Sequence, residues 1–193
     1  MKREATSEVA INLRIGPHTA GLSLSDTISG LAEFGVERAR STVHNWVQEA
    51  GLQPNSDKNP NHVAIDETVI QLNGLGYWLY AAVDPETNEF LHVRLFQTRT
   101  IVLTKQFLAE LREKHRVKNA VFLVDGAPWH KAALFELGLR FQHVTHGNRN
   151  AVERVFKELK RRTEQFANHF HHATADSAET WLQTFAFAWN RLI

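Results

Sequence analysis

Residues 63–83 have the sequence VAIDETVIQLNGLGYWLYAAV, which contains the clearest structural signals of the chain. Its first half, up to Leu72, is rich in apolar and β-branched residues and is typical of a strand. Asn73-Gly74 is a strong signal for a tight hairpin turn, because both residue types tolerate a positive φ angle. A second apolar run, from Tyr77 to Val83, supplies the partner strand. The stretch therefore predicts an antiparallel hairpin that starts a sheet.

The pattern downstream continues the sheet and adds helices. A polar turn at 84–89 precedes a third strand at 90–96, and Thr100 is placed to cap a helix. The wholly apolar run at 120–124 is typical of a buried central strand. We further expect a helix at about 129–137, a strand near 140–144, a long helix from Asn148 or Asn150 to about 167, and a last helix at about 177–192. The order βββαβαβα is that of the ribonuclease-H-like fold, an α/β architecture in which helices flank a mixed sheet.

A small helical region precedes this core. Its first helix starts near Ser23 or Ser25 and ends at Gly35, with an apolar stripe of Ile28, Leu31, Ala32 and Phe34. Its second helix ends near Gly51, and its inward-facing residues are Val43, Trp46 and Val47. Two short helices around a glycine turn resemble a helix-turn-helix, whose outward side chains would contact DNA: Arg40, Ser41, Thr42, His44 and Asn45. Helical hairpins with no role in DNA binding look alike, so this interpretation depends on the rest of the chain.

The chain divides into three parts on this interpretation. Residues 1–52 form the helix-turn-helix region and residues 62–193 form the ribonuclease-H-like catalytic domain. Residues 53–61 are polar, contain two prolines and have no periodicity, so we interpret them as a linker.

Composition narrows the class of protein. The 193 residues are 43% hydrophobic, enough for a real core, and the formal net charge is only +1. There is no cysteine, which excludes disulfides and cysteine-based zinc sites and is typical of an intracellular protein. No apolar run approaches the about 20 residues that span a bilayer, and no signal-peptide core follows the N-terminus. We expect a soluble, cytoplasmic protein that associates with the nucleoid and has no membrane partner.

Three acidic residues, Asp66, Asp125 and Glu153, stand where a strand or an amphipathic helix aims a carboxylate. Each alone could be an ordinary surface acid, turn former or partner of a helix dipole. In a ribonuclease-H-like sheet, however, the first and fourth strands are adjacent, and the helix carrying Glu153 crosses near their ends. Crowded carboxylates repel one another unless a cation holds them, and Mg²⁺ or Mn²⁺ accepts such oxygen ligands. The pattern predicts a site for two divalent ions that serves phosphoryl transfer.

The helix that carries Glu153 is basic. Lys160 lies two turns beyond Glu153 on the same face, where it would meet the DNA backbone beside the reacting phosphate. Further basic side chains would extend this phosphate track: Arg149, Arg154, Lys157, Arg161 and Arg162. The alternative explanation of the stripe is a solvated helix face with ion pairs between neighbouring turns.

The three acidic blocks resemble those of DDE transposases from insertion sequences, in particular the insertion-sequence-six group and its archaeal branch. The matching stretches are residues 63–68, 124–126 and 148–154 with Lys160, and the resemblance extends from about residue 22 to the C-terminus. It implies that Asp66, Asp125 and Glu153 are the catalytic triad and that Lys160 is the basic residue following the glutamate. It also implies Mg²⁺-dependent cleavage at element ends, strand transfer into target DNA, and a homodimer or higher multimer that holds two ends of double-stranded DNA. The interval from Asp125 to Glu153 and the segment before the first helix are both short, which leaves a truncated or inactive copy open.

Two other functions remain open from the sequence. One is a transposase remnant that binds DNA without cleaving it, and the other is a ribonuclease-H-like nuclease that does not join strands. The histidines at 169, 171 and 172 are interpreted as structural or solvent-facing rather than as zinc ligands. His143 and His146 are nearer the predicted site, and contact with DNA stays open for them. Trp129-His130 is either a loop element near the substrate or simple packing.

Overall fold

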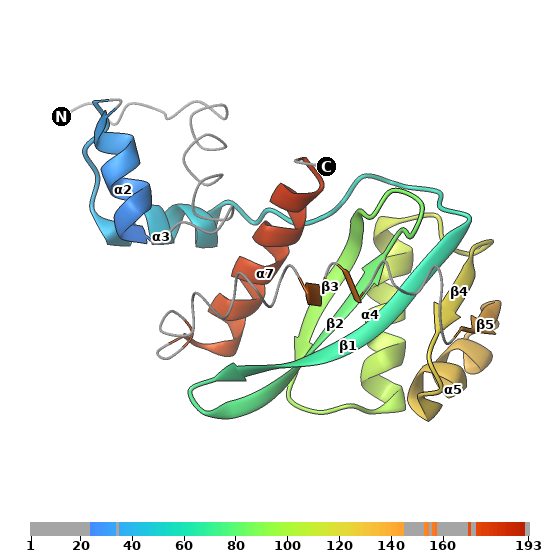
Figure 1. Cartoon of the computed structure of the whole chain (residues 1–193). Coiled ribbons are helices and arrows are strands. Elements are labelled where there is room, and N and C mark those ends of the chain that lie inside the picture. Colours follow the sequence, from blue (N-terminus) through green and yellow to red (C-terminus); the bar gives the residue numbers. More distant parts are fainter. Residues whose placement is uncertain are drawn as a thin grey trace.

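The chain folds around a five-stranded mixed sheet, which confirms the predicted fold class (Figure 1). The computed structural model describes residues 24–33, 35–144, 153–154, 156–157, 170 and 173–191. Within them the strands are β1 (His62–Leu72), β2 (Leu75–Val83), β3 (Phe90–Phe96), β4 (Val121–Val124) and β5 (Phe141–His143). Their order across the sheet is β3-β2-β1-β4-β5, with antiparallel pairs among the first three strands and parallel pairs of β4 with β1 and β5.

The β1–β2 hairpin turns where the sequence predicts it. Asn73 and Gly74 both adopt positive φ angles, 51° and 78°, as a two-residue turn of type I′ requires. The Asn73 side chain donates a hydrogen bond of 2.9 Å to the carbonyl of Ala173, just before α7 (Ala175–Trp189). This bond fixes the hairpin tip below the start of α7 in Figure 1.

Alternation along the strands separates two apolar cores, one on each face of the sheet. One face packs against α7 and Phe156, through residues that include Ala64, Ile70 and Leu123. The other face packs against α4 (Ile101–Lys114) and α5 (Pro128–Glu136), through residues that include Val63, Ile65 and Phe122. Whether a residue number on β1 or β4 is even or odd (its parity) therefore determines which of the two apolar cores its side chain faces.

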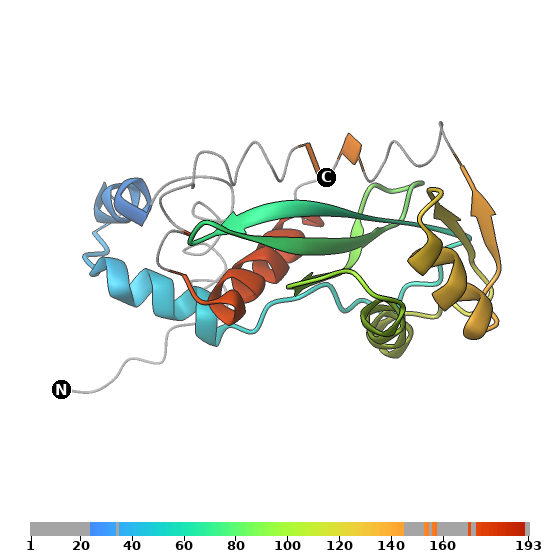
Figure 2. The ribbon, with the colours of Figure 1, turned by 90° about the horizontal axis from the view of Figure 1, so that it is seen from below.

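Two helices begin the described chain, α2 (Leu24–Glu33) and α3 (Arg40–Glu49), and they lie at the end of the molecule away from α5 (Figure 2). Helix α3 buries Val43 and Val47 as expected. The predicted stripe of α2 is partly wrong, because Ala32 is exposed and Thr27 is 1% exposed. A small alanine contributes little to packing, while Thr27 is compact enough to be buried. Ser25 lies inside the helix rather than at its cap.

The segment 53–61 has no regular secondary structure, but it is attached to the core. Asp57 forms a bidentate ion pair with Arg116 (3.0 and 2.8 Å), and Lys58 pairs with Glu89 at 2.7 Å. The peptide N–H of Lys58 also donates to Nδ1 of His115 at 3.2 Å. The predicted linker therefore packs as a strap along the domain that contains the sheet.

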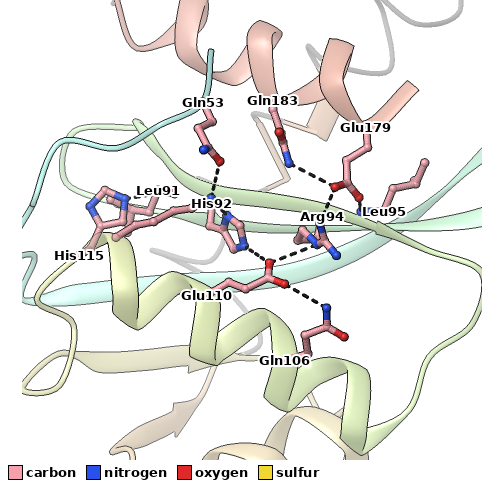
Figure 3. A network of polar contacts seen from close by, with 11 residues as sticks. Gln53, Leu91, His92, Arg94, Leu95, Gln106, Glu110, His115, Glu179 and Gln183 are labelled. Atoms are coloured by element: carbon pink, nitrogen blue, oxygen red, sulfur yellow. Dashed lines mark hydrogen bonds and ion pairs between the residues drawn. The ribbon is translucent and has the colours of Figure 1, made fainter. Parts of the chain in front are cut away.

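A network of charged side chains joins β3 to both of its neighbouring helices (Figure 3). Glu110 on α4 accepts contacts from His92 at 3.0 Å and from Arg94 at 3.1 Å. Arg94 reaches Glu179 on α7 at 2.6 Å, and Glu179 also accepts the backbone N–H of Leu95 at 2.9 Å. The network attaches β3, the edge strand of the sheet, to α4 and α7. In the described part of the chain no helix has the length and apolar character to cross a membrane.

Candidate active site

The parallel pairing of β1 with β4 determines where Asp66 and Asp125 lie. Ala64 is the register partner of Leu123, and continuing this register by two residues brings Asp66 level with Asp125. Asp66 is on the central part of β1, whereas Asp125 follows the last residue of β4. The sheet therefore brings these two predicted acids to neighbouring positions although they are far apart in sequence.

Backbone N–H groups orient both carboxylates. Oδ1 of Asp66 accepts the N–H of Glu67 at 2.9 Å, and Oδ1 of Asp125 accepts the N–H of Ala127 at 2.9 Å. The second bond closes a turn between β4 and α5, which the aspartate stabilises as its residue type favours. Asp66 is 9% exposed and the Asp125 side chain is 30% exposed, so the pair lies at the border between core and solvent.

Glu153 belongs to a helical segment, residues 153–154 and 156–157, and its side chain is exposed. One turn further on, Phe156 is 6% exposed and joins the same apolar core as Ala64 and Leu123. Those two residues lie two positions before Asp66 and Asp125 and point to the same face. The segment carrying Glu153 thus packs on the face of the sheet to which Asp66 belongs by parity.

Two of the three predicted metal ligands, Asp66 and Asp125, suit a hard divalent cation. Carboxylate oxygens on adjacent strands are the ligands that Mg²⁺ prefers, and they leave positions for water and substrate oxygens. Across the described residues no group of three or more His, Cys, Asp or Glu side chains is arranged as a metal site. The two strand acids fit the ion, and Glu153 is not grouped with them in the described arrangement.

Next to the two aspartates lies a charged cluster of the buried Glu67 and His130 and the partly exposed Arg99. Nε2 of His130 lies 3.0 Å from Oε2 of Glu67, and its Nδ1 lies 3.6 Å from Oδ1 of Asp125. Burial disfavours the charged imidazole, but the facing carboxylates of Asp125 and Glu67 outweigh this and raise the pKa of His130 to about 9. Each ring nitrogen of His130 therefore faces a carboxylate.

Arg99 completes the cluster from the segment between β3 and α4. Its guanidinium lies 3.4 Å from Oε1 of Glu67, and it is stacked between the rings of Trp78 and Trp129, at 3.6 and 4.4 Å from their centroids. Such stacking is the usual behaviour of a guanidinium between aromatic faces.

Sequence reasoning assigned no role to Glu67 or Arg99 and left His130 between two interpretations. One signal in the sequence could have identified Glu67, because it is an acid in the middle of an apolar strand. Glu67 has the parity of the buried Val63 and Ile65, so its carboxylate had to meet a buried partner.

The predicted DNA-contacting residues fall into two groups. On α3, Arg40, Ser41, His44 and Asn45 are exposed and Thr42 is half-buried, as expected for an outward face. In the helical segment after Glu153, Lys157 is exposed, and Arg154 donates a 2.8 Å hydrogen bond to Oδ1 of Asn88 in the β2–β3 turn. The remaining predicted contacts lie outside the described residues: Arg149, Lys160, Arg161 and Arg162.

The chain is similar in sequence to known proteins. The model of the DDE domain family DDE_Tnp_IS240 matches residues 61–190. The uncharacterized protein MJ0017 of Methanocaldococcus jannaschii is 34% identical over 178 residues, which are 88% of this chain and 80% of that protein. The uncharacterized protein aq_aa24 of Aquifex aeolicus is 44% identical over 55 residues, which are 28% of this chain and 46% of that protein.

Among solved structures, the catalytic core domain of BIV integrase has the same fold. It superposes with a TM-score of 0.50 at 14% sequence identity, and the match covers 66% of this chain and 82% of that one. At this identity the likeness concerns the fold alone. The extent of the family match, together with the mixed sheet that carries Asp66 and Asp125, shows that the chain belongs to the IS240-type DDE transposases.

Proposed function

We propose that this protein is a DNA transposase that cleaves the ends of an insertion element and transfers them into target DNA. The observation that carries the proposal is the register of β1 and β4, which sets Asp66 level with Asp125 in a chain of the DDE family. A carboxylate pair on adjacent parallel strands, with each acid oriented by a backbone N–H, is a preorganised ligand set for divalent ions.

In this proposal the chain positions the reacting groups and forms no covalent intermediate. Asp66 and Asp125 supply carboxylate oxygens from the sheet, and Glu153 supplies a third from its helix. Bound Mg²⁺ or Mn²⁺, as two ions, would provide charge neutralisation at the scissile phosphate. Water attacks the phosphorus at the element end and the bond to the 3′-oxygen breaks, which frees a 3′-hydroxyl. That hydroxyl then attacks a phosphodiester of the target, and a target 3′-oxygen leaves.

The remaining predicted residues hold DNA. Lys160 would neutralise phosphate next to the site, and the track beside it would continue through Arg149, Arg154, Lys157, Arg161 and Arg162. The exposed face of α3, with Arg40 and Asn45, would bind the element end in the manner of a recognition helix. Since transposition joins two ends, we propose that the active form is a homodimer or higher multimer on double-stranded DNA.

A single assay on supercoiled DNA tests this function. The plasmid carries the terminal inverted repeats of the element, and the full chain is added with Mg²⁺ or with Ca²⁺. We expect cleavage and joining with Mg²⁺, and binding without cleavage with Ca²⁺. The substitutions Asp66→Asn, Asp125→Asn and Glu153→Gln should each reduce cleavage at least about a thousandfold, or about 4 kcal/mol of transition-state stabilisation.

A matched control removes an acidic side chain outside the proposed active site. Glu86 is half-exposed in the β2–β3 turn and pairs with His62 at 3.2 Å, so Glu86→Gln should keep wild-type cleavage. Cleavage without joining would identify a nuclease, and end binding without Mg²⁺-dependent cleavage would identify a non-catalytic remnant. Strand transfer by the Asp125→Asn protein at the wild-type rate would overturn the assignment of the acids.

A further inference from the structure

We propose that Glu67 and His130 are positioning residues that hold the Asp125 carboxylate in place for a divalent ion, and that Glu67 links Asp125 mechanically to Asp66. The inference rests on the proposed function, because it concerns the same pair of acids. It assigns a role to the charged cluster of Glu67, Arg99 and His130, none of which belongs to the acidic triad.

Glu67, on β1, contacts Asp66 directly and reaches Asp125 through His130. Its backbone N–H is bonded to Oδ1 of Asp66, while its side chain lies on the opposite face of the sheet and contacts Nε2 of His130. The other ring nitrogen of His130 faces Oδ1 of Asp125 at 3.6 Å. A chain of contacts thus runs from Asp66 through Glu67 and His130 to Asp125.

Two members of the cluster, Glu67 and His130, are enclosed by the core and are therefore held in place. The His130 side chain is 0% exposed and the Glu67 side chain is 5% exposed. Tyr80, on the neighbouring strand, lies edge-on to the His130 ring at 5.9 Å between centroids. On its other oxygen Glu67 meets Arg99, which the two tryptophans hold in place. A ligand held by an enclosed partner keeps its geometry when the ion is absent, which favours metal binding.

A second buried histidine shows what an ordinary core histidine looks like here. His115 is 2% exposed, but its ring contacts backbone groups, the carbonyl of Leu91 at 2.8 Å and the N–H of Lys58 at 3.2 Å. These bonds are sufficient to explain it as a structural residue. His130 differs because both of its ring nitrogens face carboxylates, one of which belongs to a proposed metal ligand.

Mn²⁺ binding to the full chain tests the inference without depending on catalysis. Isothermal titration with Mn²⁺ alone compares wild type, Glu67→Gln and His130→Gln, with Asp125→Asn as the reference for a lost ligand. We expect Glu67→Gln and His130→Gln to raise the Mn²⁺ dissociation constant about tenfold or more, as loss of an outer-shell partner typically does. The Mg²⁺ concentration for half-maximal cleavage should rise by a similar factor, while cleavage at saturating Mg²⁺ falls less.

Two further variants separate positioning from stability. His115→Gln removes an equally buried imidazole and should lower the urea midpoint without changing the Mn²⁺ dissociation constant. Arg99→Gln alters a side chain that is 35% exposed, so it leaves no large cavity and should give a smaller rise, about two- to fivefold, if Glu67 acts through its ion pairs. Arg99→Gln therefore keeps the test open if the buried substitutions prevent folding.

Each outcome decides between the two proposals. If wild type binds no Mn²⁺ and does not cleave DNA, the proposed function fails and the positioning role fails with it. If wild type binds and cleaves, but Glu67→Gln, His130→Gln and Arg99→Gln keep its Mn²⁺ affinity, the function stands and the positioning role is wrong. Selective loss of affinity in these variants, with His115→Gln unchanged, establishes the link through Glu67.

Discussion

At the scale of single residues, Gly74 shows how one backbone angle fixes the register of the sheet. Its φ of 78° lies in the left-handed region, and nothing lies within 4 Å of the position where a Cβ would be added. A substitution there is therefore penalised by the backbone and not by crowding. Since the turn sets the pairing of β1 with β2, it also sets which β1 residues face each core.

We therefore expect Gly74→Ala to destabilise the protein by about 1 kcal/mol, since alanine adopts this φ at a cost. Gly76→Ala is the matched control in the same hairpin. Its added Cβ would make an ordinary 3.5 Å contact with Val69, and its φ is not positive, so it should be neutral or slightly stabilising. Urea unfolding followed by tryptophan fluorescence measures both. Equal losses in the two variants would contradict the role of the left-handed angle.

At the scale of elements, the network between α4, β3 and α7 makes stability depend on pH. Burial disfavours the charged form of His92 and, with Lys114 and Arg94 nearby, lowers its pKa to about 4 although Glu110 opposes the shift. The ring is 1% exposed, is stacked on Phe107 and accepts a 3.0 Å contact from Lys114. The neutral imidazole is therefore the form that this interface holds.

The folded pKa of His92 lies below the ordinary value of 6.5, so its stabilisation is complete above pH 6.5 and is lost as the pH falls to about 4. We expect the free energy of unfolding to fall by on the order of 3 kcal/mol from this residue across that window. Burial also lowers the pKa of His115, which adds in the same direction.

Urea titrations between pH 7 and pH 4 measure this dependence. His92→Gln should make the curve flatter, because the group that resists protonation is gone. His62→Gln, which alters a half-exposed imidazole, should keep the wild-type slope. A wild-type slope in His92→Gln would mean that another group controls acid stability.

At the scale of the whole molecule, the sequence was sufficient for the element order and the two strand acids, because these follow from local signals. Period-two alternation, Asn73-Gly74 and the apolar run 120–124 each act within a few residues, and the fold then brings Asp66 beside Asp125. Side-chain contacts between segments far apart in the sequence have no comparable local signal. The pairing of Glu67 with His130 and the stacking of Arg99 depend on side-chain directions that only the packed layers determine.

The same limit applies to the boundary between the two predicted domains. Sequence patterns suggest a helix-turn-helix region joined by a linker, but α3 packs directly on α7. Val47 is 1% exposed and belongs to the apolar core that includes Trp181 and Leu182, and Gln48 donates a 3.2 Å hydrogen bond to the carbonyl of Ser177. Helix α3 therefore shares an apolar core with α7 and the sheet.

This shared core predicts that a change in α3 reaches the catalytic domain. Val47→Ala should lower the stability of the whole chain by about 1–3 kcal/mol, since it removes buried methyl groups at the α3–α7 contact. Val43 is the matched control, because it lies on the same helix and is 0% exposed, yet in the described residues it is not a member of the core on α7. Val43→Ala should loosen α2 and α3 while hydrogen exchange in α7 and β1 stays slow. If Val47→Ala likewise leaves hydrogen exchange in α7 unchanged, the two helices α3 and α7 behave as parts of independent bodies. In that case, binding of an element end to α3 could not influence Asp66 and Asp125 through the packing of α3 on α7.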